Sequence, residues 1–95
     1  MIKIKKIDAS GVAFQKSFKK LPKNIQEEAR EAIKGLLKEP IPKKYRFEKL
    51  NGYKNPNVYT IHVTRNHSHK LSFEVLRGVA ILRFVGTHKK IDVTP

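Results

Sequence analysis

Residues 57–88 decide the fold and read NVYTIHVTRNHSHKLSFEVLRGVAILRFVGTH. β-Branched and aromatic residues alternate with polar and basic ones, and turn-forming residues interrupt the alternation twice. This pattern predicts three consecutive strands, at Val58–Arg65, His69–Leu76 and Val79–Val85. Because side chains alternate between the faces of a sheet, one face is expected to be buried and the other to remain polar.

Two turns set the register of these strands. A two-residue turn at Arg77-Gly78 predicts the following pairs: Leu76 with Val79, Phe73 with Leu82, and Ser72 with Arg83. A three-residue turn at 66–68 would pair His62 with Ser72, whereas a five-residue turn would pair His62 with Lys70. Both turns keep the same residues on the apolar face, since a slip of one residue would bury a lysine.

The register divides the side chains between two faces. The predicted buried face holds Tyr59, Ile61, Val63, Leu71, Phe73, Val75, Ala80, Leu82 and Phe84. The predicted open face holds Thr60, His62, Thr64, Lys70, Ser72, Glu74 and Arg83. His67, His69 and His88 are expected near one end of the sheet, so imidazoles and cations converge there in either register.

The N-terminal residues predict a strand followed by a helix. Met1–Ile7 alternates isoleucine with lysine, which is typical of a strand with one apolar face. Asp8 or Ser10 is placed to cap a helix that follows. That helix is expected to end at Leu21, because the residue before Pro22 is driven out of the helical region.

A second helix is predicted to extend to Lys38 or Glu39, ahead of Pro40. Its apolar stripe consists of Ile25, Ala29, Ala32, Ile33 and Leu36. Gly35 is expected to weaken it by about 1 kcal/mol relative to alanine. The sequence therefore predicts an α+β fold: an N-terminal strand, a helical hairpin, and a mainly antiparallel sheet of about four strands with helices on one face.

Residues 40–56 predict an irregular loop, with prolines at positions 40, 42 and 56 and a turn signal at Asn51-Gly52. Basic residues alternate there with aromatic residues and leucine. We expect Phe47 and Leu50 to anchor the loop to the core and its lysines to contact nucleic acid.

The chain has 95 residues, with 21 Lys+Arg against 8 Asp+Glu, which gives a net charge of +13. This length suits one domain, expected at residues 1–95. So positive a chain favours a polyanionic partner: nucleic acid, an anionic membrane or an acidic protein. The lack of cysteine excludes disulfides and suits a reducing cytoplasm. No apolar run predicts a transmembrane helix, and Met1–Ile7 alternates too strictly for a signal peptide.

The histidines and cations of the polar face suit RNA cleavage. A ribose 2′-OH that attacks the neighbouring phosphate needs a base, an acid and cations around the crowded phosphate. Histidine titrates in the range that both proton transfers require. No metal or cofactor is expected, because cysteines are absent, carboxylates are few, and the cations would repel a divalent ion.

Four segments, in this order, resemble the RelE/ParE superfamily of toxins from bacterial toxin–antitoxin pairs. FEKLNG at 47–52 is similar to the L-x-G approach to a strand, and VYTIHV at 58–63 to the Y-x-I-x-V strand that follows. HKLSF at 69–73 corresponds to Y-R-L/I-x-Y/F, and RFVGTH at 83–88 to the G-T-H ending of the YafQ-like branch. The resemblance covers nearly the whole chain.

The resemblance implies a cytoplasmic, ribosome-dependent mRNA interferase of a type II toxin–antitoxin system, a metal-independent endoribonuclease neutralised by a cognate antitoxin. It implies that His88 acts as general acid. Lys70 stands where the family usually places an arginine for the scissile phosphate, and His62 where RelE-like members place a lysine; a lysine lacks the bidentate fork of arginine. The candidate catalytic residues are His88, Lys70, His62, Arg65 and Arg83, and the candidate RNA contacts are His67, His69, Lys49, Lys54 and Lys89.

Several alternatives stay open. His67 and His69 are RNA contacts, the general base, or simply turn residues. ParE-like gyrase inhibitors belong to the same superfamily, but they tend not to retain the basic-and-histidine face. A non-catalytic RNA- or ribosome-binding module would carry the same cations. The sequence also departs from RelE, since no tyrosine stands near Asp92-Val93, and it is expected to lack the last helix of some members.

Overall fold

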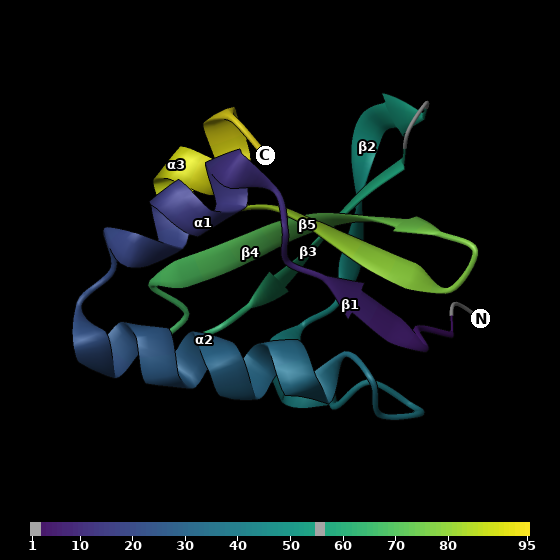
Figure 1. The fold of residues 1–95 in the computed structure, drawn as a ribbon, viewed down its shortest axis with the longest axis horizontal. Helices are drawn as coiled ribbons and strands as arrows, with labels where there is room; N and C mark the ends of the chain where they lie inside the picture. The colour runs from purple at the N-terminus through teal and green to yellow at the C-terminus, as the bar shows by residue number, and fades with distance from the viewer. Residues whose placement is uncertain (1–2, 55–56) are drawn as a thin grey trace.

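The computed structural model describes residues 3–54 and 57–95, apart from the side chains at positions 51, 53 and 54. In chain order the elements are β1 (Lys6–Asp8), α1 (Val12–Lys19), α2 (Lys23–Gly35), the 3₁₀ helix η1 (Lys43–Tyr45), β2 (Glu48–Lys54), β3 (Asn57–His62), β4 (His69–Leu76), β5 (Val79–Thr87) and α3 (His88–Val93). The strands form one sheet in the order β1-β5-β4-β3-β2 (Figure 1). Strand β1 runs parallel to β5, and the other neighbours are antiparallel.

The predicted α+β fold is confirmed, with an N-terminal strand, a helical hairpin and a mainly antiparallel sheet of five strands. Part of the strand predicted at Met1–Ile7 lies outside the described residues, and β1 begins at Lys6. The additional strand is β2, where a loop was predicted; Glu48 pairs with Thr60 there. The segment reads EKLNGYK, without strict alternation of apolar and polar residues, and its Asn51-Gly52 pair favours a turn, so local rules do not predict a strand there. In the described part of the chain, no helix combines the length and apolarity needed to cross a membrane.

Both helices of the hairpin are shorter than predicted. The Asp8 carboxylate accepts hydrogen bonds from the backbone N–H of Ser10 at 2.9 Å and from its hydroxyl at 2.6 Å. This local turn uses the groups that were expected to cap α1, so the helix begins later, at Val12. Helix α2 ends at Gly35. Beyond it, the backbone N–H groups of residues 36–38 bond to carbonyls three residues back, which is a tighter turn than an α-helix.

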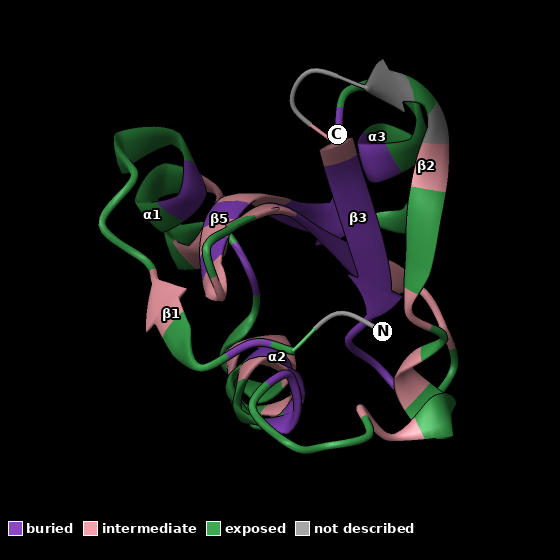
Figure 2. Cartoon of the chain, turned by 90° about the vertical axis from the view of Figure 1, so that its right-hand side faces the viewer, coloured by how far each residue is buried: buried purple, intermediate pink, exposed green. Residues whose placement is uncertain are grey.

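The main core lies between the hairpin and one face of the sheet. Strand β3 is buried over most of its length (Figure 2). Ala29, Ala32 and Leu36 of the α2 segment are fully buried against Ile61, Leu71 and Phe73 in the same apolar cluster. Three aromatic rings extend this cluster towards β2: Phe47 stacks on Tyr59 with ring centroids 5.4 Å apart, and Tyr59 on Phe73 at 5.9 Å. The prediction that Phe47 anchors its segment is therefore confirmed.

The register is partly as predicted. Leu76 pairs with Val79 and Phe73 with Leu82, as the turn at Arg77-Gly78 requires. A register shift between Ser72 and Phe73 then adds one residue to β5. Ser72 consequently pairs with Phe84, and its predicted pairing with Arg83 is wrong. The same shift turns Val85 into the core, so the prediction that Phe84 is a core residue is also wrong.

The turn between β3 and β4 follows the longer of the two alternatives. His62 pairs with Lys70, and Thr60 pairs with Ser72. The backbone N–H of Val63 still bonds to the carbonyl of His69 at 3.0 Å, which leaves residues 64–68 as a five-residue turn. The shorter turn, which would pair His62 with Ser72, is excluded.

The polar face is not open, contrary to the prediction. Five of its members are buried: Thr60, His62, Thr64, Lys70 and Ser72. Helix α3, which was not predicted, packs on β4 and β5 and buries Ile91 to 1% exposure. Asp92 of α3 bonds to Lys70, so the helix lies on the polar face and covers it.

Gly35 gives a first testable prediction. A Cβ atom built on Gly35 would lie 2.4 Å from a ring carbon of Tyr45, so the aromatic ring of η1 rests directly on the helix backbone. Alanine normally stabilises a helix by about 1 kcal/mol over glycine, but Gly35→Ala is expected to destabilise this protein by about 1–3 kcal/mol, because the ring must move. Urea denaturation measures the change. The double variant Gly35→Ala/Tyr45→Ala removes the clash and should recover part of the loss; a stabilising Gly35→Ala would contradict this packing.

Candidate functional site

Three histidines meet at one end of the polar face. His62 is the last residue of β3, His67 lies in the turn before β4, and His88 is the first residue of α3. The centroid of the His62 ring is 4.5 Å from that of His67 and 5.3 Å from that of His88. His62 is almost buried between the other two, while His67 is half-buried and His88 is exposed. The site therefore presents two accessible imidazoles with a third between them.

Hydrogen bonds within the five-residue turn hold His67 beside His62. The hydroxyl of Thr64 accepts from the backbone N–H groups of Ser68 and His69, at 3.0 and 3.2 Å. The N–H of His67 bonds to the Thr64 carbonyl at 3.1 Å, and His67 takes a left-handed φ of 57°. The N–H of His88 bonds to the Ser68 carbonyl at 2.8 Å. The turn and the start of α3 are therefore tied together, and His67 and His88 both lie next to His62.

An ammonium and a carboxylate complete the site. Lys70 Nζ lies 2.8 Å from Asp92 Oδ1 and 3.8 Å from a carboxylate oxygen of Glu48. The other oxygen of Asp92, Oδ2, lies 2.8 Å from His88 Nδ1. The hydrogen bond from Lys70 is the main cause that holds the pKa of Asp92 below its usual value, with further help from the charge of Lys70. Asp92 is thus a carboxylate that accepts from two donors at once.

The fold also changes the proton affinity of His62. Burial is the main cause that lowers the pKa of His62, and the positive surroundings of His67, Lys70, His88 and Arg46 lower it further. Its Nδ1 is buried, and no hydrogen-bond partner for that atom exists among the described residues. A neutral imidazole at neutral pH follows from this environment. Such a group is suited to accept a proton, not to donate one.

The lowered pKa of His62 makes a prediction about stability. Protons bind more tightly to this histidine in the unfolded chain than in the folded one, so acid favours unfolding. The free energy of unfolding is expected to fall as the pH drops below the unfolded pKa of about 6.5, and the fall continues down to the lower pKa of the folded state. Urea titrations between pH 7.5 and pH 5 measure it. In His62→Gln the slope over this range should be shallower; an identical slope would show that His62 does not cause it.

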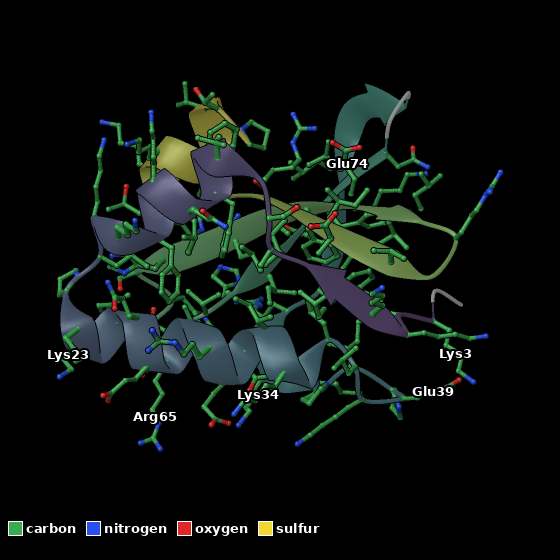
Figure 3. All side chains as sticks on the ribbon, viewed as in Figure 1. Lys3, Lys23, Lys34, Glu39, Arg65 and Glu74 are labelled. Atoms are coloured by element: carbon green, nitrogen blue, oxygen red, sulfur yellow. The ribbon has the colours of Figure 1, made fainter. Side chains whose placement is uncertain are left out.

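Not every predicted site residue joins the cluster. Arg83 forms an ion pair with Glu74 and donates to the Pro95 carbonyl at 3.4 Å. Glu74 lies four residues beyond Lys70 on β4, roughly 13 Å along the strand. The His69 ring bonds to the Ser68 hydroxyl at 2.7 Å and lies on the opposite face from Lys70. Arg65 is exposed, and Figure 3 shows Glu74 and Arg65 on opposite sides of the sheet.

The candidate RNA contacts on the surface come from different elements. Lys49 is exposed on β2, and Lys89 is exposed on α3 beside His88. Lys54 closes β2, but its side chain lies outside the described residues. A groove of about 780 Å³ opens next to His67. It has a basic wall from η1 and the following residue, and an acidic wall from α2: Lys43, Lys44 and Arg46 face Glu27, Glu28 and Glu31.

Sequence reasoning missed two members of the site. Asp92 follows His88 by four residues, a spacing that places both on one face of a helix. The signal was present, but it has meaning only if residues 88–93 form a helix, and no helix was expected there. Arg46 was hidden in a segment interpreted as a loop; it takes a left-handed φ of 49° just after η1 and lies close enough to influence His62.

Comparison with known proteins supports one structural relationship. No protein-family model matches the sequence, and no curated protein matches it. A chain in the RelB–RelE antitoxin–toxin complex from Methanococcus jannaschii is 26% identical and has a TM-score of 0.67, over 90% of this chain and 96% of that one. A chain in the RelE–RelB complex from Pyrococcus horikoshii OT3 is 21% identical, with a TM-score of 0.64 over 92% and 96% of the two chains.

YafQ from E. coli strain BL21(DE3) is 16% identical, with a TM-score of 0.69 over 96% of this chain and 98% of YafQ. The architecture of strand, helical hairpin and sheet is thus shared along nearly the whole length of these toxin structures. These structural neighbours support the RelE-like toxin superfamily, which the order of the sequence motifs indicated.

Proposed function

We propose that this chain is the toxin of a type II toxin–antitoxin pair and that it cleaves mRNA on the ribosome. One observation carries the proposal: the His62 ring lies 4.5 Å from the His67 ring and 5.3 Å from the His88 ring, centroid to centroid, beside a buried lysine on a RelE-like fold. When a 2′-OH cleaves RNA, the reaction needs groups that transfer protons and groups that stabilise the crowded phosphate. The net charge of +13 favours a polyanionic substrate.

The proposed chemistry assigns one histidine to each proton. The ribose 2′ oxygen attacks the adjacent phosphorus while His62, neutral in its buried position, accepts the 2′ proton. The bond from phosphorus to the 5′ oxygen breaks, and His88 donates a proton to that leaving oxygen. The products are a 2′,3′-cyclic phosphate and a 5′-hydroxyl. Proton transfers of this kind each contribute about 10²–10⁴-fold to a rate.

Cations stabilise the phosphate in this proposal. The charges of Lys70 and Arg46 lie close enough to His62 to lower its pKa. We assign to these two cations the stabilisation of the negative charge that develops on the phosphate oxygens. His67 is assigned to a contact with the neighbouring nucleotide, since its ring is half-buried and lies beside His62 in a tilted arrangement. Lys49, Lys54 and Lys89 are proposed to bind the RNA backbone on either side, with Arg65 as a more distant contact. His69 and Arg83 have no catalytic assignment.

An antitoxin is the proposed protein partner. The structures from M. jannaschii and P. horikoshii are complexes of a RelE toxin with a RelB antitoxin. An excess of 13 positive charges on this chain favours fast association with an acidic protein. The cytoplasm, where mRNA is translated, is the proposed site of action.

A translation extract tests the proposal. Purified protein is added to an extract that translates a defined mRNA, and the new 5′ ends are mapped by primer extension. Cuts within the translated region, absent when translation is blocked, are expected. Intact mRNA together with inhibited gyrase supercoiling would instead support a ParE-like function. Salt-sensitive RNA binding without any cuts would support a non-catalytic module.

A further inference from the structure

We propose that Asp92 is a positioning residue for the cleavage reaction: its carboxylate joins Lys70 and His88 and fixes which nitrogen of His88 exchanges protons. This inference rests on the proposed function, because it assigns the orientation of the proposed general acid. Asp92 belongs to α3 and would not itself contact the RNA. Its role comes from its two carboxylate oxygens, which bond to Lys70 and His88.

The geometry around Asp92 supports this role. Oδ1 lies 2.8 Å from Lys70 Nζ, and Oδ2 lies 2.8 Å from His88 Nδ1. A carboxylate has acceptors on both oxygens, whereas an asparagine amide has one acceptor and one donor. Only an acid at this position therefore satisfies both donors at the same time. The Asp92 carboxylate is also the nearest counter-charge of the buried Lys70 ammonium, because the Glu48 carboxylate is 3.8 Å away and largely exposed.

The hydrogen bond to Asp92 determines the form of the His88 ring. When Nδ1–H donates to the carboxylate, the free ring nitrogen is Nε2, on the far side of the imidazole. In the doubly protonated ring, the Nε2 proton is then the one given to a leaving oxygen, and the neutral ring that remains keeps its proton on Nδ1. Without the carboxylate, the ring is free to rotate about its χ angles and to place its proton on either nitrogen. Orientation of a histidine by a carboxylate is a general way to prepare such a group.

Other contacts hold helix α3 in place, so the effect of Asp92 on His88 is separable from the folding of the helix. Ile91 is buried to 1% exposure and anchors the helix on the sheet. The Thr87 hydroxyl accepts from the N–H of Lys90 at 3.3 Å, and the His88 N–H bonds to the Ser68 carbonyl at 2.8 Å. Loss of the Asp92 carboxylate should therefore leave α3 on the sheet while it frees the imidazole.

NMR of the full chain tests the inference without any assay of activity. Long-range ¹H–¹⁵N spectra of His88 at neutral pH should show protonation at Nδ1 in the wild type. In Asp92→Asn the signal is expected to shift towards the Nε2-protonated form, or towards an exchange average of the two. A neutral wild-type His88 ring that carries its proton on Nε2 and leaves Nδ1 bare would overturn the proposal even if the variant failed to fold.

Kinetics give the second readout. In the translation extract, Asp92→Asn is expected to lower kcat by about 10–100-fold, the usual effect of removing a group that orients a histidine, with little change in KM. Glu74→Gln is the matched control, because it removes a carboxylate from an ion pair on the same strand as Lys70; its kcat and His88 spectrum should match the wild type. A loss of kcat in Asp92→Asn without a change in the His88 ring would overturn the positioning role.

The two proposals fail in different ways. If the wild type does not cut mRNA, the proposed function is wrong, and the ring of His88 still reports whether Asp92 orients it. If the wild type cuts mRNA and Asp92→Asn cuts equally fast, only the role of Asp92 is wrong.

Discussion

His88→Ala is expected to lower the rate of mRNA cleavage by about 10²–10⁴-fold, the contribution of a general acid. Its side chain is 46% exposed, and its backbone N–H, which ties α3 to the turn, is kept by alanine. The variant should therefore fold and bind RNA but leave the 5′ oxygen without a proton donor. Single-turnover cleavage of a ribosome-bound mRNA measures the effect.

Lys90→Ala provides the control for His88→Ala. Lys90 lies two residues further along α3, is exposed, and has no role in the proposed mechanism. It should cleave at close to the wild-type rate, so that a loss confined to His88→Ala cannot be attributed to the helix. If His88→Ala cuts as fast as the wild type, the assignment of His88 as the acid is wrong.

Lys70→Met is expected to lower the cleavage rate by about 10²–10³-fold, the effect of removing one group that stabilises transition-state charge. Methionine has nearly the length of the lysine stem and fills the buried position without the charge. The Asp92 carboxylate left behind is 43% exposed and remains hydrated, so the loss of stability should be smaller than the about 3–5 kcal/mol typical of a broken, fully buried pair.

Two measurements separate charge from packing in Lys70→Met. Urea denaturation should show a folded, cooperative protein, and cleavage should be lost without a comparable loss of RNA binding. Lys34→Met, on the exposed surface of α2, removes the same charge far from the site and should cleave normally. Cleavage by Lys70→Met at the rate of Lys34→Met would show that Lys70 is a structural residue.

The length of the turn between β4 and β5 was enough to predict the strand pairs next to it. The turn at Arg77-Gly78 fixed the pairs next to it, because a two-residue turn allows only one register, and Leu76 pairs with Val79 as expected. The register shift at Ser72 has no such signal. It depends on how β5 must bend to keep Val85 in the core, and it moved Phe84 and Arg83 relative to their predicted partners.

The sequence predicted that histidines and cations would converge at one end of the sheet, but it did not predict all of the residues that meet there. His62, Lys70 and His88 are brought together, because alternation places the first two on one face and the third follows the last strand. Arg83 was expected in the same row, but the register shift at Ser72 removes it from its predicted pairing, and it forms an ion pair with Glu74. The remaining part of the site depends on the short helix α3. Ile91 carries too weak a signal to predict α3 by itself, and only α3 gives Asp92 a place in the site.

The burial of its polar residues also changes how the polar face can meet RNA. Thr60 and Ser72 looked like solvent-facing residues of an antiparallel sheet, yet they are 1% and 0% exposed. The face is a second packed layer that ends at the histidines, and not an open platform. RNA is therefore expected to meet the protein at the edge of this layer, where His67 and His88 are accessible.

The chemical form of the cut ends tests the central claim most directly. Cleavage by the 2′-OH with His62 as base and His88 as acid must leave a 2′,3′-cyclic phosphate on the upstream fragment and a 5′-hydroxyl on the downstream fragment. Mass spectrometry of the fragments from a translated mRNA, together with labelling of the 5′ ends by polynucleotide kinase without prior phosphatase, identifies both groups. The account predicts these two ends; fragments with a 5′-phosphate and a 3′-hydroxyl would contradict it.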